Sequence, residues 1–234
     1  MKKLLLLLIL ILIFSCTKKE VKLPVLAEKG IQELHNHSQV WLFFEIENKD
    51  TIAIVNRKNT ISTTHWIYNI DKRLPLKAII PSIIKLQDKH ANSMHSEKGM
   101  HDYFSYSDTI SKKLSFLEFD GVIFKTDSFL SKPYIKDHIA NYSNYNNISL
   151  LFTNTKNWID DSPVEKRELK QALNKFIEFS AEGKQIMLHL NFTKNISYQN
   201  YMYFKTTLNN LCNEVIKINK LEFIFDEEKV HFCY

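Results

Sequence analysis

The feature that most constrains this chain is an apolar run at its N-terminus. Residues 1–3 form a short basic start, residues 4–14 are all apolar, and Ser15 and Cys16 end the run. A basic start, a short apolar core and a small residue at the end are the layout of a secretory signal peptide. The run is shorter than the roughly 20 apolar residues that a stable membrane-spanning helix needs. We therefore expect residues 1–15 to be removed and the folded part of the chain to lie after them.

The end of this run resembles the lipobox of bacterial lipoproteins. Cys16 is preceded by the small Ser15 and, three positions back, by the aliphatic Ile13. In that family the cysteine sulfur is thioether-linked to diacylglycerol, the peptide is cut just before it, and the new amino terminus is acylated. The resemblance implies that Cys16 carries a lipid and that residues 16–25 are a short tether at a membrane of the bacterial cell envelope. Thr17 follows Cys16 where an inner-membrane lipoprotein has Asp, which favours the outer membrane, with the domain in the periplasm or at the cell surface.

The composition of the remaining chain is that of a folded protein. Removing 15 of the 234 residues leaves 219, enough for one large domain or two small ones, and Gly and Pro are scarce. Loss of Lys2 and Lys3 lowers the formal net charge from +5 to about +3. No dense run of basic residues follows the signal, so we expect no nucleic-acid partner.

Two cysteines remain after Cys16. Cys212 and Cys233 enclose a loop of about 21 residues, and a disulfide across it would contribute on the order of 3 kcal/mol in an oxidising envelope. Two separate buried thiols are the alternative, because spacing along the sequence does not fix the distance between the sulfurs.

The first half of the chain alternates between strand-like and helix-like patterns. Apolar runs at residues 40–46 and 51–55, separated by a polar turn, predict a β-hairpin. Residues 63–70, 103–106 and 122–124 predict further strands. Helices are expected at residues 26–35, from residue 74 onward around an internal Pro81, and at residues 108–116, where Ser111 would be the N-cap.

The second half shows the same alternation more clearly. Residues 128–147 have no hydrophobic period and predict a linker. Strands are expected at residues 148–152, 186–192, 221–225 and 230–233. Ser162, Pro163 and Glu165 match a capping box for a helix that ends near residue 181, and Ser197 is the expected N-cap of a helix that ends near residue 217.

Two similar stretches suggest an internal repeat. Residues 104–111 and 190–197 each combine a strand end, a polar crossing and an Ile-Ser pair before a predicted helix. The predicted fold class is therefore α/β (α+β), with two tandem β-α-β-α-β units, the first carrying an added N-terminal β-hairpin. The expected units are residues 26–127 and 148–234, joined by the linker at 128–147.

Residues 148–225 also resemble the periplasmic domain of the ExbD/TolR family, the partners of envelope proton channels. The resemblance rests on the strand at residues 186–191, the polar crossing at residues 193–198 and the helix and strand after it. It implies a domain that binds envelope proteins or cell wall. Proton coupling is not implied, because residues 4–14 lack the membrane Asp of that family and Asn191 and Lys194 replace common acidic residues.

Histidines are the candidates for metal chemistry. His35 and His37 share one face of an extended segment, and His90, His95 and His101 lie in one predicted loop. Neutral imidazole is a common ligand of zinc and copper. These two groups are the candidate metal ligands, although their spacing matches no known zinc motif.

The sequence contains no recognised catalytic motif. It has no Gly-rich phosphate loop and no Gly-x-Ser-x-Gly elbow. We therefore expect a non-catalytic, lipid-anchored envelope protein without a cofactor, which binds an envelope protein or peptidoglycan. The alternative is a lipid-anchored metal-binding protein or metal-dependent hydrolase that uses the histidine groups.

Overall fold

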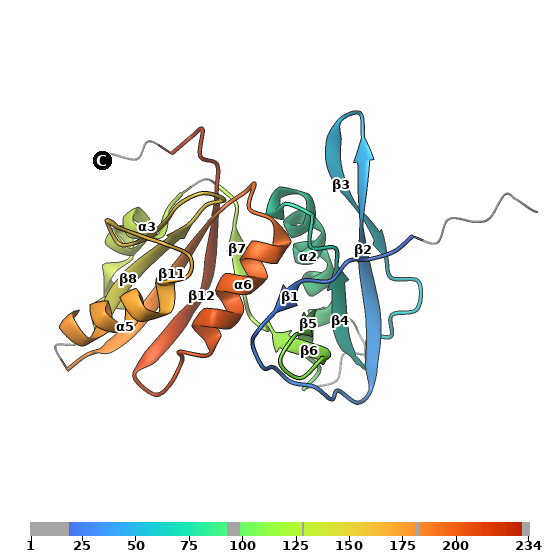
Figure 1. The fold of residues 1–234 in the computed structure, drawn as a ribbon, viewed down its shortest axis with the longest axis horizontal. Helices are drawn as coiled ribbons and strands as arrows, with labels where there is room; N and C mark the ends of the chain where they lie inside the picture. Colours follow the sequence, from blue (N-terminus) through green and yellow to red (C-terminus); the bar gives the residue numbers. More distant parts are fainter. Residues whose placement is uncertain (1–18, 93–98, 128, 181–182, 231–234) are drawn as a thin grey trace, which may run out of the picture.

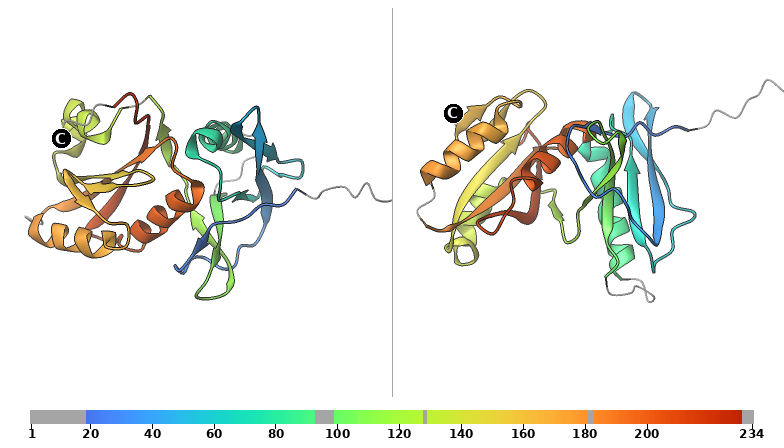
Figure 2. Two further views of the ribbon diagram at one scale, coloured as in Figure 1. Left: turned by 45° about the horizontal axis from the view of Figure 1, so that its top comes forward. Right: turned by 60° about the horizontal axis from the view of Figure 1, so that its bottom comes forward.

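The computed structural model describes residues 19–92, 99–127, 129–180 and 183–230. Within these residues, five helices and two mixed six-stranded sheets are interleaved along the chain, which confirms the α/β (α+β) class. The two sheets stand side by side, with helices α2 (Leu76–Ala91) and α6 (Tyr198–Asn209) near their junction (Figures 1 and 2). No helix in these ranges is both long and apolar enough to span a bilayer. The predicted signal peptide, with Cys16, lies outside the described residues.

The first sheet contains the expected β-hairpin. Its strands are β1 (Val25–Leu26), β2 (His37–Glu47), β3 (Asp50–Asn56), β4 (His65–Ile70), β5 (Asp102–Asp108) and β6 (Lys113–Glu118). The order is β3-β2-β4-β5, with β6 antiparallel to β5 and the short β1 parallel to the end of β5. Asn48 and Lys49 form the two-residue turn between β2 and β3, and both have positive φ, 49° and 71°. These values are those of a type I′ turn, whose twist matches the twist of the two strands.

The second sheet follows the same plan with more helices around it. Its strands are β7 (Ile123–Lys125), β8 (Tyr145–Phe152), β9 (Asn157–Ile159), β10 (Ser162–Val164), β11 (Gln185–Thr193) and β12 (Ile216–Phe225), and its other helices are α3 (Ser131–Asp137), α4 (Ile139–Tyr142) and α5 (Leu169–Ser180). The order is β10-β9-β8-β11-β12-β7. Helices α5 and α6 lie on one side of this sheet and α3 on the other (Figure 1).

The two units repeat one another in strand order. The series β3-β2-β4-β5 has the same pattern of one antiparallel and two parallel pairs as the series β9-β8-β11-β12. Helix α2 connects β4 to β5 as α6 connects β11 to β12. Residues 65–76 therefore correspond to residues 187–198, so the predicted pairing of residues 104–111 with 190–197 has the wrong register.

The starts of α2 and α6 are joined by reciprocal hydrogen bonds. Leu76 N–H donates to the Ile196 carbonyl (3.0 Å), and Tyr198 N–H donates to the Leu74 carbonyl (2.7 Å). Lys77 N–H donates to the Lys194 carbonyl (2.8 Å), with its counterpart running from Gln199 to Lys72 (3.1 Å). The first N–H groups of a helix have no partner inside it. Each unit thus satisfies the free N–H groups at the helix start of the other.

A buried asparagine holds equivalent strands together in each unit. Asn69 on β4 donates from Nδ2 to the Val40 carbonyl on β2 (3.5 Å), and Asn191 on β11 donates to the Leu150 carbonyl on β8 (2.9 Å). Both asparagines are buried, at 2% and 0% exposure. A buried amide without a hydrogen-bond partner would be destabilising. The same side-chain hydrogen bond therefore satisfies an asparagine at the equivalent position of each sheet.

One hydrophobic core runs through both units. The expected stripe on α2 is observed, with Ile79, Ile80 and Ile83 buried, and it belongs to the same cluster as the inner faces of both sheets. At the junction, Phe104 of the first unit packs edge-to-face on Tyr198 of the second, with ring centroids 5.8 Å apart. Phe104 also packs edge-to-face on Tyr201, with centroids 6.1 Å apart, so large aromatic side chains are buried across the junction.

Two predicted helices in the first unit are wrong. Residues 26–35 contain no helix, and Gly30 passes so close to β5 that a Cβ there would overlap the Tyr106 hydroxyl oxygen. Residues 108–116 form the turn and second strand of the β5–β6 hairpin. Asp108 accepts hydrogen bonds from Ile110 N–H (2.8 Å) and the Ser111 hydroxyl (2.7 Å), so Ser111 stabilises a turn and is not an N-cap.

The predicted cap at Ser162 is also wrong, whereas the cap at Ser197 is confirmed. Ser162 begins the edge strand β10, where Pro163 can lack an N–H without breaking the sheet. Helix α5 begins at Leu169. The Ser197 hydroxyl accepts the Asn200 N–H (3.3 Å) at the start of α6.

The predicted linker at residues 128–147 is not a linker. It contains α3, α4 and the first residues of β8. Strand β7, placed by the sequence in the first unit, pairs with β12 of the second sheet, so the chain passes between the sheets at residues 119–122. Ser131 at the start of α3 is held by Asn191, which accepts its N–H (2.7 Å). This tertiary contact positions the start of α3, although the sequence of the segment shows no hydrophobic period.

Candidate metal centre

A group of histidines and carboxylates lies at one end of the first sheet. The strands bring it together because His101 just precedes β5, Glu118 ends β6, and Tyr103 pairs with Glu118 in the antiparallel hairpin. Two residues further along each strand, His101 and Asp120 therefore come to lie opposite one another. His65 at the start of β4 is the next neighbour in the sheet.

Three donor atoms converge at this end of the hairpin. The nearest ligand atoms of His101, Glu118 and Asp120 all lie within 4.8 Å of one another. The Nδ1 atom of His101 donates a hydrogen bond to Asp120 Oδ2 and lies 3.6 Å from Glu118 Oε1. The three side chains are 38%, 46% and 32% exposed, so an ion from solvent can reach them.

Neighbouring groups fix two of these three side chains. Asp120 Oδ1 accepts the Asp102 backbone N–H at 2.6 Å, which leaves Oδ2 for His101. The His101 ring stacks on the His65 ring, with centroids 5.6 Å apart, and His101 N–H donates to His65 Nδ1 (3.0 Å). Because Nδ1 of His65 is an acceptor, its proton is on Nε2. Partial burial, together with the nearby His101, lowers the pKa of His65 and keeps this ring neutral.

A second, buried histidine–carboxylate pair lies behind the first. His90, at the end of α2, has Nδ1 2.8 Å from Asp102 Oδ1 and Nε2 3.0 Å from the Thr64 carbonyl. Its ring stacks on Trp66, with centroids 4.2 Å apart. The Thr64 carbonyl can only accept, so Nε2 carries a proton. Burial opposes the charged ring, but the hydrogen bond and the charge of Asp102 outweigh it and raise the pKa of His90.

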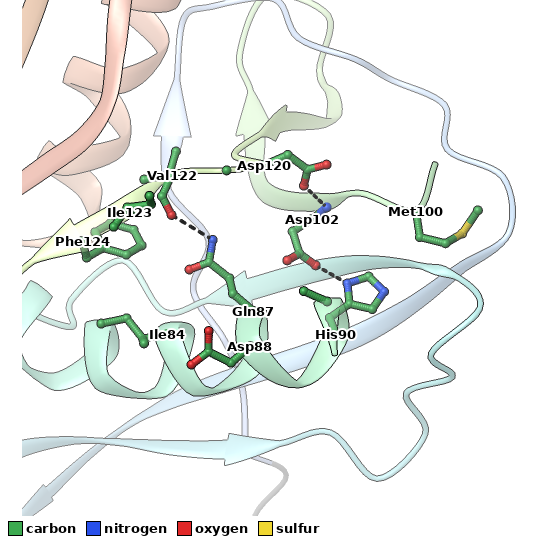
Figure 3. A pocket seen from close by; sticks show the side chains of 12 residues that line it. Ile84, Gln87, Asp88, His90, Met100, Asp102, Asp120, Val122, Ile123 and Phe124 are labelled. Atoms are coloured by element: carbon green, nitrogen blue, oxygen red, sulfur yellow. Dashed lines mark hydrogen bonds and ion pairs between the residues drawn. The ribbon is translucent and has the colours of Figure 1, made fainter. Parts of the chain in front are cut away.

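A cavity of about 450 Å³ opens beside these groups (Figure 3). It lies between the end of α2 and residues 119–124, and Gln87 spans these two walls by donating to the Val122 carbonyl (3.3 Å). Its polar lining includes Asp88, His90, Asp102 and Asp120, whereas its apolar lining includes Ile84, Met100, Val122, Ile123 and Phe124. Asp120 thus belongs both to the three-residue group and to the cavity.

The donor set suits a divalent transition metal. One imidazole nitrogen with two carboxylate oxygens is a ligand combination that Zn²⁺, Mn²⁺ and Fe²⁺ accept. Three protein ligands leave coordination positions open for water or a substrate. Coordination through His101 Nδ1 would require this nitrogen to give up its proton, because a ring nitrogen binds a metal only in its deprotonated form.

The structure separates the histidines that the sequence grouped. His101 belongs to the candidate site, while both nitrogens of His90 are used by Asp102 and Thr64. His35 is exposed, and His37 donates from Nδ1 to the Leu34 carbonyl (3.0 Å) and is registered beside His65 on β4. His95 lies outside the described residues.

The predicted disulfide stays a prediction. Cys212 is exposed and its Sγ lies 3.6 Å from the Leu208 carbonyl. Cys233 lies outside the described residues, so the structure does not test the pairing of the two cysteines.

The sequence pattern does not indicate three residues of this site, namely His65, Glu118 and Asp120. Glu118 and Asp120 follow a segment whose pattern predicts a helix, and a helix would not place them beside His101. Recognition of the β5–β6 hairpin would have revealed the group, since its register sets residues 101 and 120 opposite one another.

Comparison with known proteins adds no assignment. No protein-family model, curated protein or solved structure matches this chain.

Proposed function

We propose that this chain is a lipid-anchored protein of the bacterial cell envelope that binds a divalent transition-metal ion through His101, Glu118 and Asp120. The observation that carries the metal proposal is the convergence of their three ligand atoms within 4.8 Å. The lipid anchor at Cys16 and the placement at the outer membrane rest on the N-terminal sequence pattern.

The surroundings of the three ligands support metal binding over a simple ion pair. The hydrogen bond from Asp102 N–H to Asp120 and the stacking of His101 on His65 orient two ligands before any ion arrives. Such outer contacts are typical of metal sites, where they fix the ring and the carboxylate. They also mean that less side-chain conformational entropy is lost when an ion binds.

Titration of the untagged, chelator-treated protein with Zn²⁺ or Mn²⁺ tests this proposal. Calorimetry should show one ion per chain. His101→Ala should lower the affinity by about 10-fold or more, whereas His35→Ala, at an exposed histidine elsewhere, should leave it unchanged. Equal affinity in the His101→Ala variant would rule out this site.

A second candidate function is binding of an envelope protein or peptidoglycan without catalysis. It is supported by the order β8–α5–β11–α6–β12 in the second unit, which is the order that the resemblance to the ExbD/TolR periplasmic domain implies. Crosslinking in cells, followed by purification of the lipidated protein, should recover one recurrent envelope partner or muropeptide. Repeated captures that contain neither would count against this candidate.

A further inference from the structure

The β2–β3 hairpin has an apolar face that neither hydrophobic core covers. Side chains alternate along a strand, and Leu42 and Phe44 on β2 point into the core. The intervening residues Trp41 and Phe43 point the other way, and their rings stack with centroids 6.4 Å apart. On β3, Ile54 pairs with Phe43, which extends the apolar face across both strands.

These side chains are partly exposed to solvent in the described part of the chain. Trp41 is 36% exposed, and Phe43, Ile52 and Ile54 are half-buried at the edge of the sheet. None of the four belongs to, or packs against, either core cluster of the described residues. A contiguous apolar patch of this kind on a folded domain marks a contact surface.

The first described residue, Lys19, contacts a side chain on this same face. Lys19 Nζ lies 2.7 Å from Oε2 of Glu45, which is on the same face of β2 as Trp41 and Phe43 and pairs with Ile52 on β3. Further on, Lys22 N–H donates to Asp71 Oδ2 (3.1 Å) and the Lys22 carbonyl accepts Lys72 N–H (2.7 Å). The predicted tether, as far as it is described, is therefore bound to the domain and does not hang free of it.

Covalent geometry limits how far the anchor cysteine can lie from Lys19. Three residue steps separate Cys16 from Lys19, and a fully extended chain covers roughly 10 Å in that number of steps. The diacylglycerol on Cys16 would begin in the headgroup region of the bilayer. Lys19, and with it the side of the hairpin that its side chain contacts, must then lie within roughly two headgroup layers of the anchor, because one such layer is roughly 5–8 Å thick.

We propose that the face formed by Trp41, Phe43, Ile52 and Ile54 rests on the lipid surface to which Cys16 is anchored. This inference depends on the lipid anchor of the proposed function. The face has the chemistry of a membrane interface, since Trp prefers the headgroup level and aliphatic side chains enter the acyl boundary. Three acids lie on this side of the hairpin: Glu45 is paired with Lys19, which limits the cost of bringing it near lipid, whereas Glu47 and Asp50 are exposed next to the turn, beyond the apolar residues. The lipid then fixes the orientation of the domain as well as its location.

Tryptophan quenching in vesicles tests this orientation. The lipidated protein is reconstituted in phosphatidylcholine vesicles whose acyl chains carry bromine, a short-range quencher of Trp fluorescence. The chain has three Trp, and Trp66 is buried at 2% exposure. The wild-type protein should be quenched, and Trp41→Phe should lose most of the quenching. The matched control Trp158→Phe, in the second unit, should retain it. Replacement of both Phe43 and Ile54 by Ser, with Trp41 kept, should also reduce it.

The outcomes separate this inference from the anchor. Palmitate labelling and flotation of the wild-type protein with the vesicles, together with quenching that depends on Trp41, support the inference. Labelling and flotation without Trp41 quenching overturn it and leave the anchor intact, and a photocrosslink from position 43 to an envelope protein would assign the face to a protein partner. Loss of labelling in the wild-type protein overturns both the anchor and the inference.

Discussion

The pKa of a buried histidine in this protein depends on what faces its two ring nitrogens. His189 on β11 is fully buried, donates from Nε2 to Asn147 Oδ1 (2.9 Å) and accepts at Nδ1 from Asn219 Nδ2 (2.9 Å). A second proton would place two donors face to face. Burial lowers the pKa of His189 to about 4, whereas His90, which faces Asp102, has a raised pKa.

His189 should make the protein less stable in acid. Its pKa is about 4 in the folded state against 6.5 in the unfolded state, so its contribution is present above pH 6.5 and is lost as the pH falls toward 4. The loss is on the order of 3 kcal/mol. Urea unfolding at pH 7 and pH 4 measures it. In His189→Gln, whose side chain does not titrate, the difference in unfolding free energy between the two pH values should shrink by about this amount, whereas in the control His35→Gln it should not change. An unchanged difference in His189→Gln would contradict this account.

At the scale of elements, the β2–β3 turn is a type I′ turn that has Lys49 at a position where glycine is favoured. Lys49 has φ of 71°, a left-handed conformation that costs a non-glycine residue about 1–2 kcal/mol. Lys49→Gly should therefore raise the unfolding free energy by roughly 1 kcal/mol, which chemical denaturation can measure. Lys49→Ala keeps the Cβ and serves as the control. A gain of equal size in Lys49→Ala would show that the lysine side chain, not the backbone, is responsible.

Elements with a strong local signal could be predicted from the sequence. The β2–β3 hairpin, the buried stripe of α2 and the Ser197 cap of α6 depend on residues close together in the chain, and all three are confirmed. Residues 108–116 were missed because their polar and apolar residues fit a helix, while the observed hairpin is fixed by Asp108 and by pairing with β5. The candidate metal site depends on that pairing, so the sequence indicated His101 without its carboxylate partners.

At the scale of the whole molecule, the two units share one hydrophobic core, and each supplies hydrogen-bond acceptors to the first helix turn of the other. The reciprocal hydrogen bonds at Leu76 and Tyr198 cap helices from the opposite unit, and one core joins the two sheets. The sequence does not reveal these contacts, because they join residues far apart in the chain and because equivalent strands share few residue types. When residues 65–76 are aligned with residues 187–198, Asn69 and Asn191 are identical residues at equivalent, buried positions.

Tyr198 allows this coupling to be measured. Its ring is fully buried against Phe104 of the other unit, and its hydroxyl finds no hydrogen-bond partner among the described residues. Tyr198→Phe should be neutral or raise the unfolding free energy by about 1 kcal/mol, because it removes an unpaired buried hydroxyl. Tyr198→Ala leaves a cavity at the junction and should lower the unfolding free energy by about 3–5 kcal/mol. Amide hydrogen exchange should then show the same loss of protection in β4 as in β11, since unfolding is cooperative across the shared core. Loss of protection confined to β11, with β4 unchanged, would mean that the two units unfold independently.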